Sequence, residues 1–337
     1  MAAQTNTEGG VPFYKIGTIG GKADAYISKD LFDEYKMKYS FPHKGEVMIT
    51  CAGTVGKCII YNGEDSYYQD SNIVWIDNPN EIISNDFLYH LLSKINWSHL
   101  NSTTIVRIYN DDLRNLKLYY PHHDEQKKIT HLFQLINERI ATQNKIIEDL
   151  KKLKSAIRKR IFTSLKNEHT ENYEINQLFA YEQPSAYIVA NDEYSADTTL
   201  TPVLTANKGF VLGYTDEDFG IYQKGECIIF DDFTMDAKYV SFPFKVKSSA
   251  IKILTAKLNV NLRFMFEYLS YLGLKSEEHK RHYISEIASL VIELPSKEKQ
   301  NRIANLMTSL DNKLALEEKV KAKYEDKKQY LLSQMFI

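Results

Sequence analysis

The chain has 337 residues, of which 43% are hydrophobic and 26% are charged, and its formal net charge is -2. This length accommodates about two domains with cores of their own, and the composition is typical of globular proteins. A net charge near zero counts against a simple DNA-binding protein, because such proteins are usually basic.

No run of about 18 apolar residues is present, so the sequence predicts no transmembrane helix and no membrane contact. Residues 1–8 also lack the charged-then-apolar pattern of a signal segment. The three cysteines, Cys51, Cys58 and Cys227, are odd in number and have no metal-ligand spacing. They indicate free thiols in a reducing compartment, so we expect a cytoplasmic protein.

The first globular part, residues 1–121, predicts a mostly β domain with short helices. Residues 44–49 form a turn pattern followed by a strand pattern, and residues 71–76 predict a second strand. Residues 87–93 have the amphipathic spacing of a short helix. Residues 113–118 are expected to form the last strand of this domain.

Residues 122–163 predict a first long helix, which no proline or glycine interrupts. Its apolar residues alternate at spacings of three and four, as in a coiled coil. These residues are Phe133, Ile136, Ile140, Ile147, Leu150, Ile157 and Ile161. Near its end lies the basic run 151–160, which suits either a solvated helix face near a C-terminus or a surface that faces phosphate.

The second half, residues 164–295 followed by a second long helix at 296–337, repeats the first. Aligned without a gap, the two halves match at many positions of the helices. The matched pairs are Pro121 with Pro295, Gln126 with Gln300, Ile129 with Ile303, Leu132 with Leu306, Ala141 with Ala315, Lys145 with Lys319 and Phe162 with Phe336. A repeat of this length indicates a duplicated module with an approximate two-fold axis.

The duplication extends upstream of the helices into the globular parts. Residues 224–229 resemble 44–49, residues 249–254 resemble 71–76, and residues 264–270 resemble 87–93. The most divergent segments are 51–57 and 231–238, where loops are expected, so a shared scaffold carries different loops. Relative to the second half, the first domain is short at its N-terminal side.

The predicted fold class is therefore α+β. Two mostly β domains with short helices are separated by two long antiparallel helices, which form an intramolecular coiled coil within a pseudo-two-fold repeat. A helix of about 38 residues would be a spacer about 57 Å long. Three positions, Ile146, Leu153 and Val320, widen the apolar stripe beyond the needs of two helices, so they are candidates for binding a partner.

A search for catalytic chemistry finds no enzyme motif. A phosphate-binding loop and a dinucleotide fingerprint are both missing from the sequence. The histidines at 122, 123 and 131 lack zinc-ligand spacing. We therefore predict a non-enzymatic protein with no cofactor and no metal.

Nucleic-acid contacts remain possible at several residues. Asp231 and Asp232 follow a buried strand pattern, where an acidic pair suits either a turn or hydrogen bonds from cytosine amino groups. An Arg-x-Tyr pair occurs in both halves and suits either packing at the helix root or contacts with guanine and phosphate. The candidates for DNA contact are Lys22, Thr54, Lys57, Arg107, Tyr109, Thr205, Lys208, Asp232, Thr234, Lys238, Lys280, Arg281 and Tyr283.

These motifs together resemble the specificity subunits of type I restriction-modification enzymes. The resemblance rests on the Pro-x4-Gln-x2-Ile pattern before each long helix and on four further segments. These are Lys44-Gly-Glu-Val-Met-Ile-Thr-x2-Gly-Thr-Val-Gly-Lys57, Ile228-Ile-Phe-Asp-Asp-Phe-Thr234 with Pro202-Val-Leu-Thr-Ala upstream, and Lys238-Tyr-Val-x-Phe-Pro-Phe-Lys-Val-Lys-Ser-Ser249. The short first domain departs from the family plan.

The resemblance implies two target-recognition domains joined by two helices, each domain reading one half of a bipartite site in double-stranded DNA. It also implies two methyltransferase subunits as partners and, through the complex, a restriction subunit. From the residues alone, another class remains open, a scaffold whose two domains bind proteins across a coiled-coil spacer. Salt-dependent DNA affinity would distinguish the two.

Overall fold

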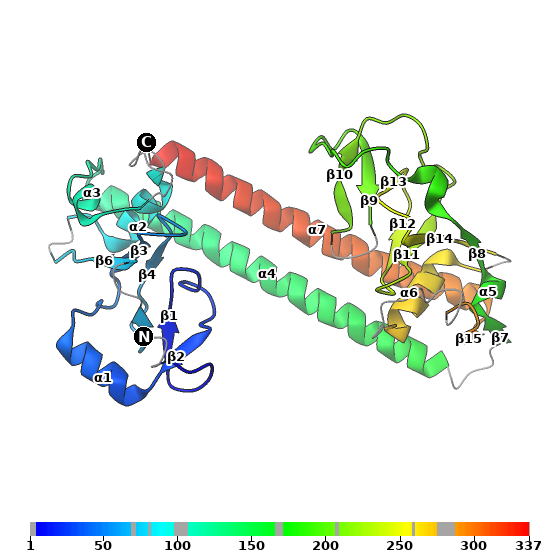
Figure 1. The fold of residues 1–337 in the computed structure, drawn as a ribbon, viewed down its shortest axis with the longest axis horizontal. Helices are drawn as coiled ribbons and strands as arrows, with labels where there is room; N and C mark the ends of the chain where they lie inside the picture. The colour runs from blue at the N-terminus through cyan, green and yellow to red at the C-terminus, as the bar shows by residue number, and fades with distance from the viewer. Residues whose placement is uncertain are drawn as a thin grey trace. The chain divides into compact units, whose positions relative to one another are not determined.

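The computed structural model describes residues 5–68, 72–79, 82–97, 107–165, 171–205, 209–257, 260–274 and 287–336. Two compact units divide the chain: residues 1–144 with 320–337, and residues 145–319. Each long helix, α4 (His123–Leu165) and α7 (Lys297–Met335), therefore contributes one half to each unit. Figure 1 shows both helices as continuous ribbons.

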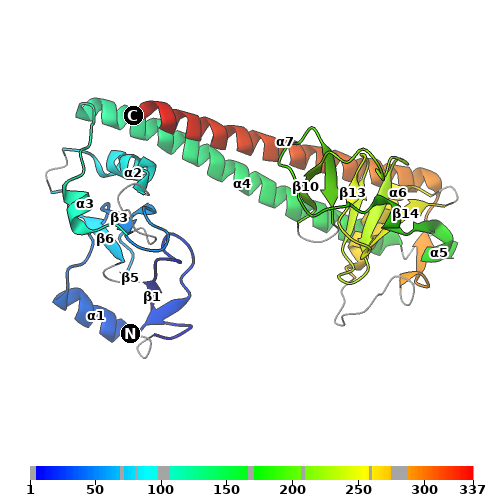
Figure 2. The same ribbon diagram turned by 45° about the horizontal axis from the view of Figure 1, so that its top comes forward.

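Within its described residues, the first unit carries two small sheets and three short helices. Its elements are β1 (Val11–Tyr14), β2 (Ala25–Ile27), α1 (Lys29–Lys38), β3 (Val47–Thr50), β4 (Cys58–Ile60), β5 (Tyr67–Tyr68), β6 (Ile73–Ile76), α2 (Asn85–Lys94) and α3 (Asn110–Arg114). The strand orders are β2-β1-β5 and β4-β3-β6. Helix α2 packs on β3 and β4, and Figure 2 shows α2 next to β3.

The second unit contains the same arrangement with additional strands. Its elements are β7 (Glu171–Glu174), α5 (Ile175–Leu178), β8 (Phe179–Glu182), the 3-10 helix η3 (Pro184–Tyr187), β9 (Thr201–Leu204), β10 (Val211–Thr215), β11 (Cys227–Asp231), β12 (Ala237–Val240), β13 (Lys245–Val246), β14 (Ile251–Ala256), α6 (Leu262–Leu272) and β15 (Val291–Leu294). Its sheets have the orders β10-β9-β13, β12-β11-β14-β8 and β15-β7.

The strand topology confirms that the globular parts are copies. In each unit one strand, β1 or β9, pairs antiparallel with the strand that follows it and parallel with a later two-residue strand. The central strand, β3 or β11, lies between two antiparallel neighbours in both units. It is buried along its whole length in both units because one face meets a helix and the other a second sheet.

The long helices run antiparallel, because in both units the beginning of one helix packs against the end of the other. In the first unit Ile129 and Phe133 of α4 share a core with Phe336. In the second unit Phe162 of α4 shares a core with Ile303 and Met307. The predicted fold class, with two mostly β domains and a pair of long antiparallel helices, is thus confirmed.

The repeated glutamine joins each long helix to a short one. Gln126 Oε1 accepts the backbone N–H of Ser84 at 2.8 Å, and Gln300 Oε1 accepts that of Asn261 at 3.0 Å. Ser84 and Asn261 are the N-cap residues of α2 and α6, the two copies of the short helix. Both amide nitrogens also donate to the carbonyl oxygen of the preceding motif proline. The Pro-x4-Gln pattern therefore joins the start of a long helix to the start of a short helix in both units.

The sequence prediction for residues 113–118 was wrong. The segment begins in α3 and continues as extended chain without strand pairing, whereas its counterpart forms β15 in the second unit. A strand requires a partner, and β15 pairs with β7, for which the described residues of the first unit provide no counterpart. Helix α1 was not predicted either, and the corresponding stretch of the second unit, between β10 and β11, contains no helix.

Candidate functional site

In the first unit, the candidate DNA-contacting residues gather on two adjoining loops. The loop after β3 is tied to residues 15–21, because Thr54 Oγ1 donates to the carbonyl oxygen of Ile16 at 3.3 Å. Lys57 Nζ donates to the carbonyl oxygen of Ile19 in the same loop. Lys22 is exposed directly after this loop. The structure therefore brings Thr54 and Lys57 onto the loop at 15–21, which Lys22 follows in sequence, and both Thr54 and Lys57 already donate hydrogen bonds to that loop.

The Arg-x-Tyr segment of the first unit lies at the same end of β3. The backbone N–H of Ile108 donates to the carbonyl oxygen of Cys51 at 2.9 Å, which docks the segment beside the end of the strand. The guanidinium of Arg107 lies 5.7 Å from the centre of the Tyr109 ring, within cation–π range. The Tyr109 side chain is 58% exposed, so its hydroxyl is available to an external partner.

In the second unit, the loop after β11 occupies the equivalent place in the topology. The Asp231 carboxylate accepts the backbone N–H groups of Phe233 and Thr234, both at 2.9 Å. Met235 adopts a left-handed backbone conformation with φ of 59°, which closes the tight turn into β12. Thr234 is exposed, and Lys238 is half-buried on β12. The loop is thus held rigidly from within and presents Thr234 outward.

Asp232 lies on the inner side of the same loop. Its side chain is buried, and one carboxylate oxygen is 3.5 Å from Nζ of the buried Lys252. The backbone N–H of Asp232 also donates to the carbonyl oxygen of Ala250. This burial favours the turn interpretation of the acidic pair over hydrogen bonding to cytosine.

The remaining candidates are only partly described. Thr205 follows β9, is half-buried, and donates its backbone N–H to the carbonyl oxygen of Phe210 at 3.0 Å. Lys208, Lys280, Arg281 and Tyr283 lie outside the described residues. The second Arg-x-Tyr pair therefore stays a prediction.

The basic run 151–160 is largely used within the second unit. Glu267 on α6 has no solvent exposure and receives Arg158 of α4 at 2.7 Å and Arg263 at 2.6 Å, with Lys154 at 3.6 Å. Asp311 of α7 pairs with both Lys154 and Arg263. This buried network joins α4, α6 and α7, so Lys154 and Arg158 hold the unit together and do not form a phosphate-binding surface.

At the equivalent position, the first unit has a buried histidine in place of the buried glutamate. The repeat aligns Glu267 with His90, whose side chain is buried against the rings of Phe133 and Phe336, with ring centres 4.7 and 5.8 Å away. Burial, with a smaller effect from Lys328, lowers the pKa of His90 to about 4. Lys328 is the repeat counterpart of Lys154. A neutral aromatic cluster thus replaces the ionic one.

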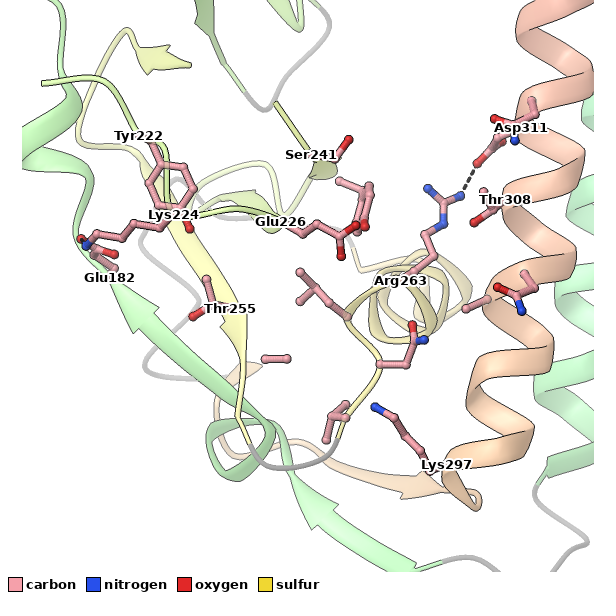
Figure 3. Close-up of a pocket in the computed structure, with 18 residues that line it drawn as sticks. Glu182, Tyr222, Lys224, Glu226, Ser241, Thr255, Arg263, Lys297, Thr308 and Asp311 are labelled. Atoms are coloured by element: carbon pink, nitrogen blue, oxygen red, sulfur yellow. Dashed lines mark hydrogen bonds and ion pairs between the residues drawn. The ribbon is translucent and has the colours of Figure 1, made fainter. Parts of the chain in front are cut away.

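A polar cleft of about 940 Å³ opens in the second unit between the β12-β11-β14-β8 sheet, α6 and α7 (Figure 3). Its charges are mostly neutralised within the wall. Lys224 pairs with Glu182 at 2.7 Å at one end, and Arg263 faces Asp311 at the other. Because cations and anions alternate along the wall, the cleft does not favour a polyanion.

The outer faces of the long helices expose apolar side chains. Ile146 and Leu153 of α4 are 38% and 48% exposed, and Val320 of α7 is half-buried. Sequence reasoning missed Leu316, which is 54% exposed and lies one helical turn before Val320. Its spacing from Val320 was the available signal. We call Ile146, Leu153 and Leu316, all in the second unit, the outer apolar face.

The architecture defines a class of protein in which two copies of one β domain present divergent loops on a shared pair of helices. A family model for the type I restriction modification DNA specificity domain matches residues 2–152 and 167–325. The chain belongs to this family. Among the residues that the structure describes, no helix is long and apolar enough to cross a membrane.

Individual relatives agree with this family. A specificity subunit of a type I restriction enzyme from Haemophilus influenzae is 51% identical over 126 residues, covering 37% of this chain and 33% of its own. One from Escherichia coli is 43% identical over 127 residues, 36% of this chain and 31% of its own. These two matches therefore span about a third of each relative. The MjaX specificity subunit of Methanocaldococcus jannaschii is 24% identical over 98% of this chain and 88% of its own.

Solved structures share the fold. The S subunit of a type I restriction-modification system from M. genitalium aligns with a TM-score of 0.61 at 16% identity, covering 100% of this chain and 91% of that one. A second structure, from work on complex assembly and conformational transition of the type I system, aligns with a TM-score of 0.57 at 12% identity. It covers 98% of this chain and 92% of that one.

Proposed function

We propose that this chain is the non-catalytic DNA-recognition subunit of a type I restriction-modification complex. The observation that carries the proposal is the duplicated domain, in which the loop after β3 and the loop after β11 differ in sequence but occupy the same place in the topology. Each loop, with its neighbours, would read one half of a bipartite site in double-stranded DNA. The names of the relatives as specificity subunits support this assignment.

The exposed residues suit this task by their chemistry. Lys22 offers a cation to phosphate and Tyr109 offers a hydroxyl group to phosphate or base edges, whereas the Thr54 hydroxyl, which donates to Ile16, can accept from a base amino group. Thr234 takes the corresponding position in the second unit. Only a few basic residues, such as Lys22 and Lys57, lie on these loops, so isolated DNA affinity should be modest and should fall with salt.

The test is to co-express the chain with its methyltransferase subunit and to map modified adenines across the host genome. Thr54→Ala with Lys22→Ala should relax or change only one half of the methylated sequence. Thr234→Ala should affect only the other half. Lys152→Ala, at an exposed lysine on α4 paired with Glu148, is the matched control and should leave the motif unchanged. A methylated site without two separable halves would contradict the proposal.

We further propose that two methyltransferase subunits bind the long helices and that a restriction subunit joins through them. The outer apolar face offers unpaired aliphatic side chains on two helices, which suits helix packing by a partner. Replacing Ile146 and Leu153 with lysine should reduce co-purification of the methyltransferase. Lysine at the exposed Glu148, between them on α4, is the control, and unchanged co-purification of the double variant would refute this docking site.

A further inference from the structure

The loop after β11, residues 231–236, has three carboxylates that differ in their surroundings. Asp231 and Asp232 are buried, whereas Asp236 is exposed. The Asp231 carboxylate accepts backbone N–H groups of its own loop, and the Asp232 carboxylate faces the buried ammonium of Lys252. Asp236 is therefore the carboxylate of this loop that can reach a molecule outside it.

The buried ammonium of Lys252 holds one side of this loop. Its Nζ lies 3.5 Å from the Asp232 carboxylate and donates to Oε1 of Gln183 at 3.2 Å. The centre of the Tyr181 ring lies 5.5 Å from the same nitrogen. A buried charge without its partner is costly, so Asp232 cannot turn outward without leaving Lys252 short of its counterion. The loop is thus fixed to β14 and to β8.

The first unit has other residues at these positions. Cys51 takes the place of Asp232, because the backbone N–H of each donates to the residue just before the neighbouring strand, β6 or β14. Val74 takes the place of Lys252, because each pairs with the residue two positions before Cys51 or Asp232. The loop after β3, residues 51–57, contains no aspartate or glutamate. The two loops therefore differ in chemistry.

The side chain of Asp236 is held in place by its neighbours. The Thr234 hydroxyl donates to Oδ2 of Asp236 at 3.2 Å, and the backbone N–H of Asp236 donates to Thr234 Oγ1 at 3.4 Å. Between them, Met235 is buried in the left-handed conformation. Oδ1 of Asp236 accepts no hydrogen bond from the part of the chain that the structure describes. This oxygen is thus an oriented acceptor that an outside donor can use.

An exposed carboxylate on a surface that meets DNA has few suitable partners. It is repelled by phosphate, and it can only accept hydrogen bonds. In the major groove, guanine and thymine present acceptors, and adenine presents an amino group beside an acceptor nitrogen. Cytosine alone presents an amino group with no acceptor on the same base. A fixed carboxylate in this groove therefore matches cytosine.

We propose that Asp236 determines one base of the second half-site by accepting a hydrogen bond from the amino group of a cytosine in the major groove. Lys252 is a positioning residue, because it keeps Asp232 inside and so keeps the loop in the conformation that presents Asp236. This reading of cytosine rests on the proposed function, in which the loop after β11 faces DNA. The two half-sites are then read by unlike chemistry.

The test uses the full chain co-expressed with its methyltransferase subunit, with modified adenines mapped across the host genome. The parent should require one C·G pair in the second half-site that the variants no longer require. Asp236→Ala should accept any base there. Asp236→Asn should favour adenine, because an amide pairs with the amino group and the acceptor nitrogen of adenine together. A second half-site that is unchanged in both variants, or a changed first half-site, would overturn the proposal.

Asp218→Asn is the matched control. Asp218 is an exposed carboxylate of the same unit, on the segment before β11, and its substitution removes the same charge. Both asparagine variants should gain similar nonspecific affinity for phosphate, and only Asp236→Asn should change the methylated sequence. An equal change of the sequence in both variants would overturn the assignment to Asp236.

The role of Lys252 is tested with purified complex and two DNA duplexes. For the parent, replacing the C·G pair by T·A should lower kcat/KM about tenfold, which corresponds to about 1.4 kcal/mol. The double variant Lys252→Met with Asp232→Leu should stay folded, because apolar side chains can replace a buried ion pair, and its unfolding temperature verifies this. Its preference for the C·G duplex should nevertheless shrink toward one. A stable double variant with the full preference would show that Lys252 does not position Asp236.

This proposal and the proposed function fail in different ways. If Thr234→Ala changes the second half-site while Asp236→Ala does not, the loop after β11 reads DNA and the role of Asp236 is wrong. If neither substitution changes the site, the loop does not face DNA, and the proposed function is wrong as well.

Discussion

A buried glutamine in each repeat fixes the junction between a long helix and a short helix through its hydrogen bonds. Gln126 is fully buried, and its amide makes three hydrogen bonds, to Ser84, Ile82 and Pro121. Its partners are backbone groups, which cannot turn toward other acceptors when the amide is removed. The side chain is therefore a fixed link between the start of α4 and the start of α2.

Gln126→Ala should destabilise the first unit by about 2 kcal/mol, because it leaves buried backbone donors and acceptors unsatisfied. Both tryptophans of the chain lie in this unit, so urea unfolding followed by tryptophan fluorescence measures its stability. Gln134→Ala, at an exposed position of the same helix, serves as the control. An equal effect of the two substitutions would show that the junction contributes little.

His90 predicts an acid sensitivity confined to the first unit. Its folded-state pKa of about 4 lies below the usual value of 6.5, so the contribution of neutral His90 is complete above pH 6.5. As the pH falls from 6.5 to 4, the unfolded chain binds a proton that the folded unit does not, and about 3 kcal/mol is lost. Urea unfolding at pH 7 and pH 5, followed by tryptophan fluorescence, should show about 2 kcal/mol of this loss, because pH 5 lies between the two pKa values.

The control for this prediction is His90→Phe, which keeps a ring among Phe87, Phe133 and Phe336 and removes the titrating group. Carboxylates elsewhere contribute equally to both proteins, so the difference between them isolates His90. If the variant loses as much stability as the parent between pH 7 and pH 5, the histidine is not the source.

At the scale of the elements, the buried network around Glu267 replaces apolar packing where α4, α6 and α7 meet. Glu267→Gln should destabilise the second unit by about 3–5 kcal/mol, because Arg158 and Arg263 would keep their charges without a buried counterion. Hydrogen exchange in α6 should then accelerate. Glu148→Gln, which breaks an exposed pair on α4, should have little effect, and similar exchange in both variants would contradict this account.

Several helices and strands could be predicted from the sequence. The repeat located β3, β6, α2 and both long helices, because apolar periodicity and turn glycines are local signals. It also predicted a strand at 113–118 that is absent, because strand formation there depends on a partner such as β7 and no local pattern records that. The apolar periodicity of the long helices likewise did not indicate that each helix is divided between two units.

The candidate site was predicted only in outline. Sequence divergence pointed to the loops after β3 and β11, and both Thr54 and Thr234 are exposed there. It could not show that Asp232 turns inward to Lys252, or that Thr54 and Lys57 are bound to the loop at 15–21. Such partners are distant in sequence, and only the folded chain reveals which polar groups are already occupied.

At the scale of the whole molecule, the length of the paired helices predicts the spacing of the DNA site. Inserting seven residues into α4 after Asn144 and seven into α7 before Val320 would lengthen both helices by about 10 Å. The unread spacer should then grow by about three base pairs, since one turn of DNA is about 34 Å. Sequencing of methylated genomic sites measures the spacer. An insertion in one helix alone should instead impair assembly.

The first unit is built from residues 1–144 and 320–337, and this limits where recombination can exchange its amino-terminal part. Phe133 and Phe336 contact each other in one core although about 200 positions separate them. The effects of substitutions at the two residues are therefore coupled. A recombination event that imports a foreign amino-terminal domain with a crossover near residue 121 keeps Phe133 and Phe336 together, while Phe87 and Leu91 of the same core come from the imported domain. A crossover near residue 150 leaves a hybrid whose two halves evolved in different lineages. Surviving natural chimaeras should therefore have their junctions before the long helix begins.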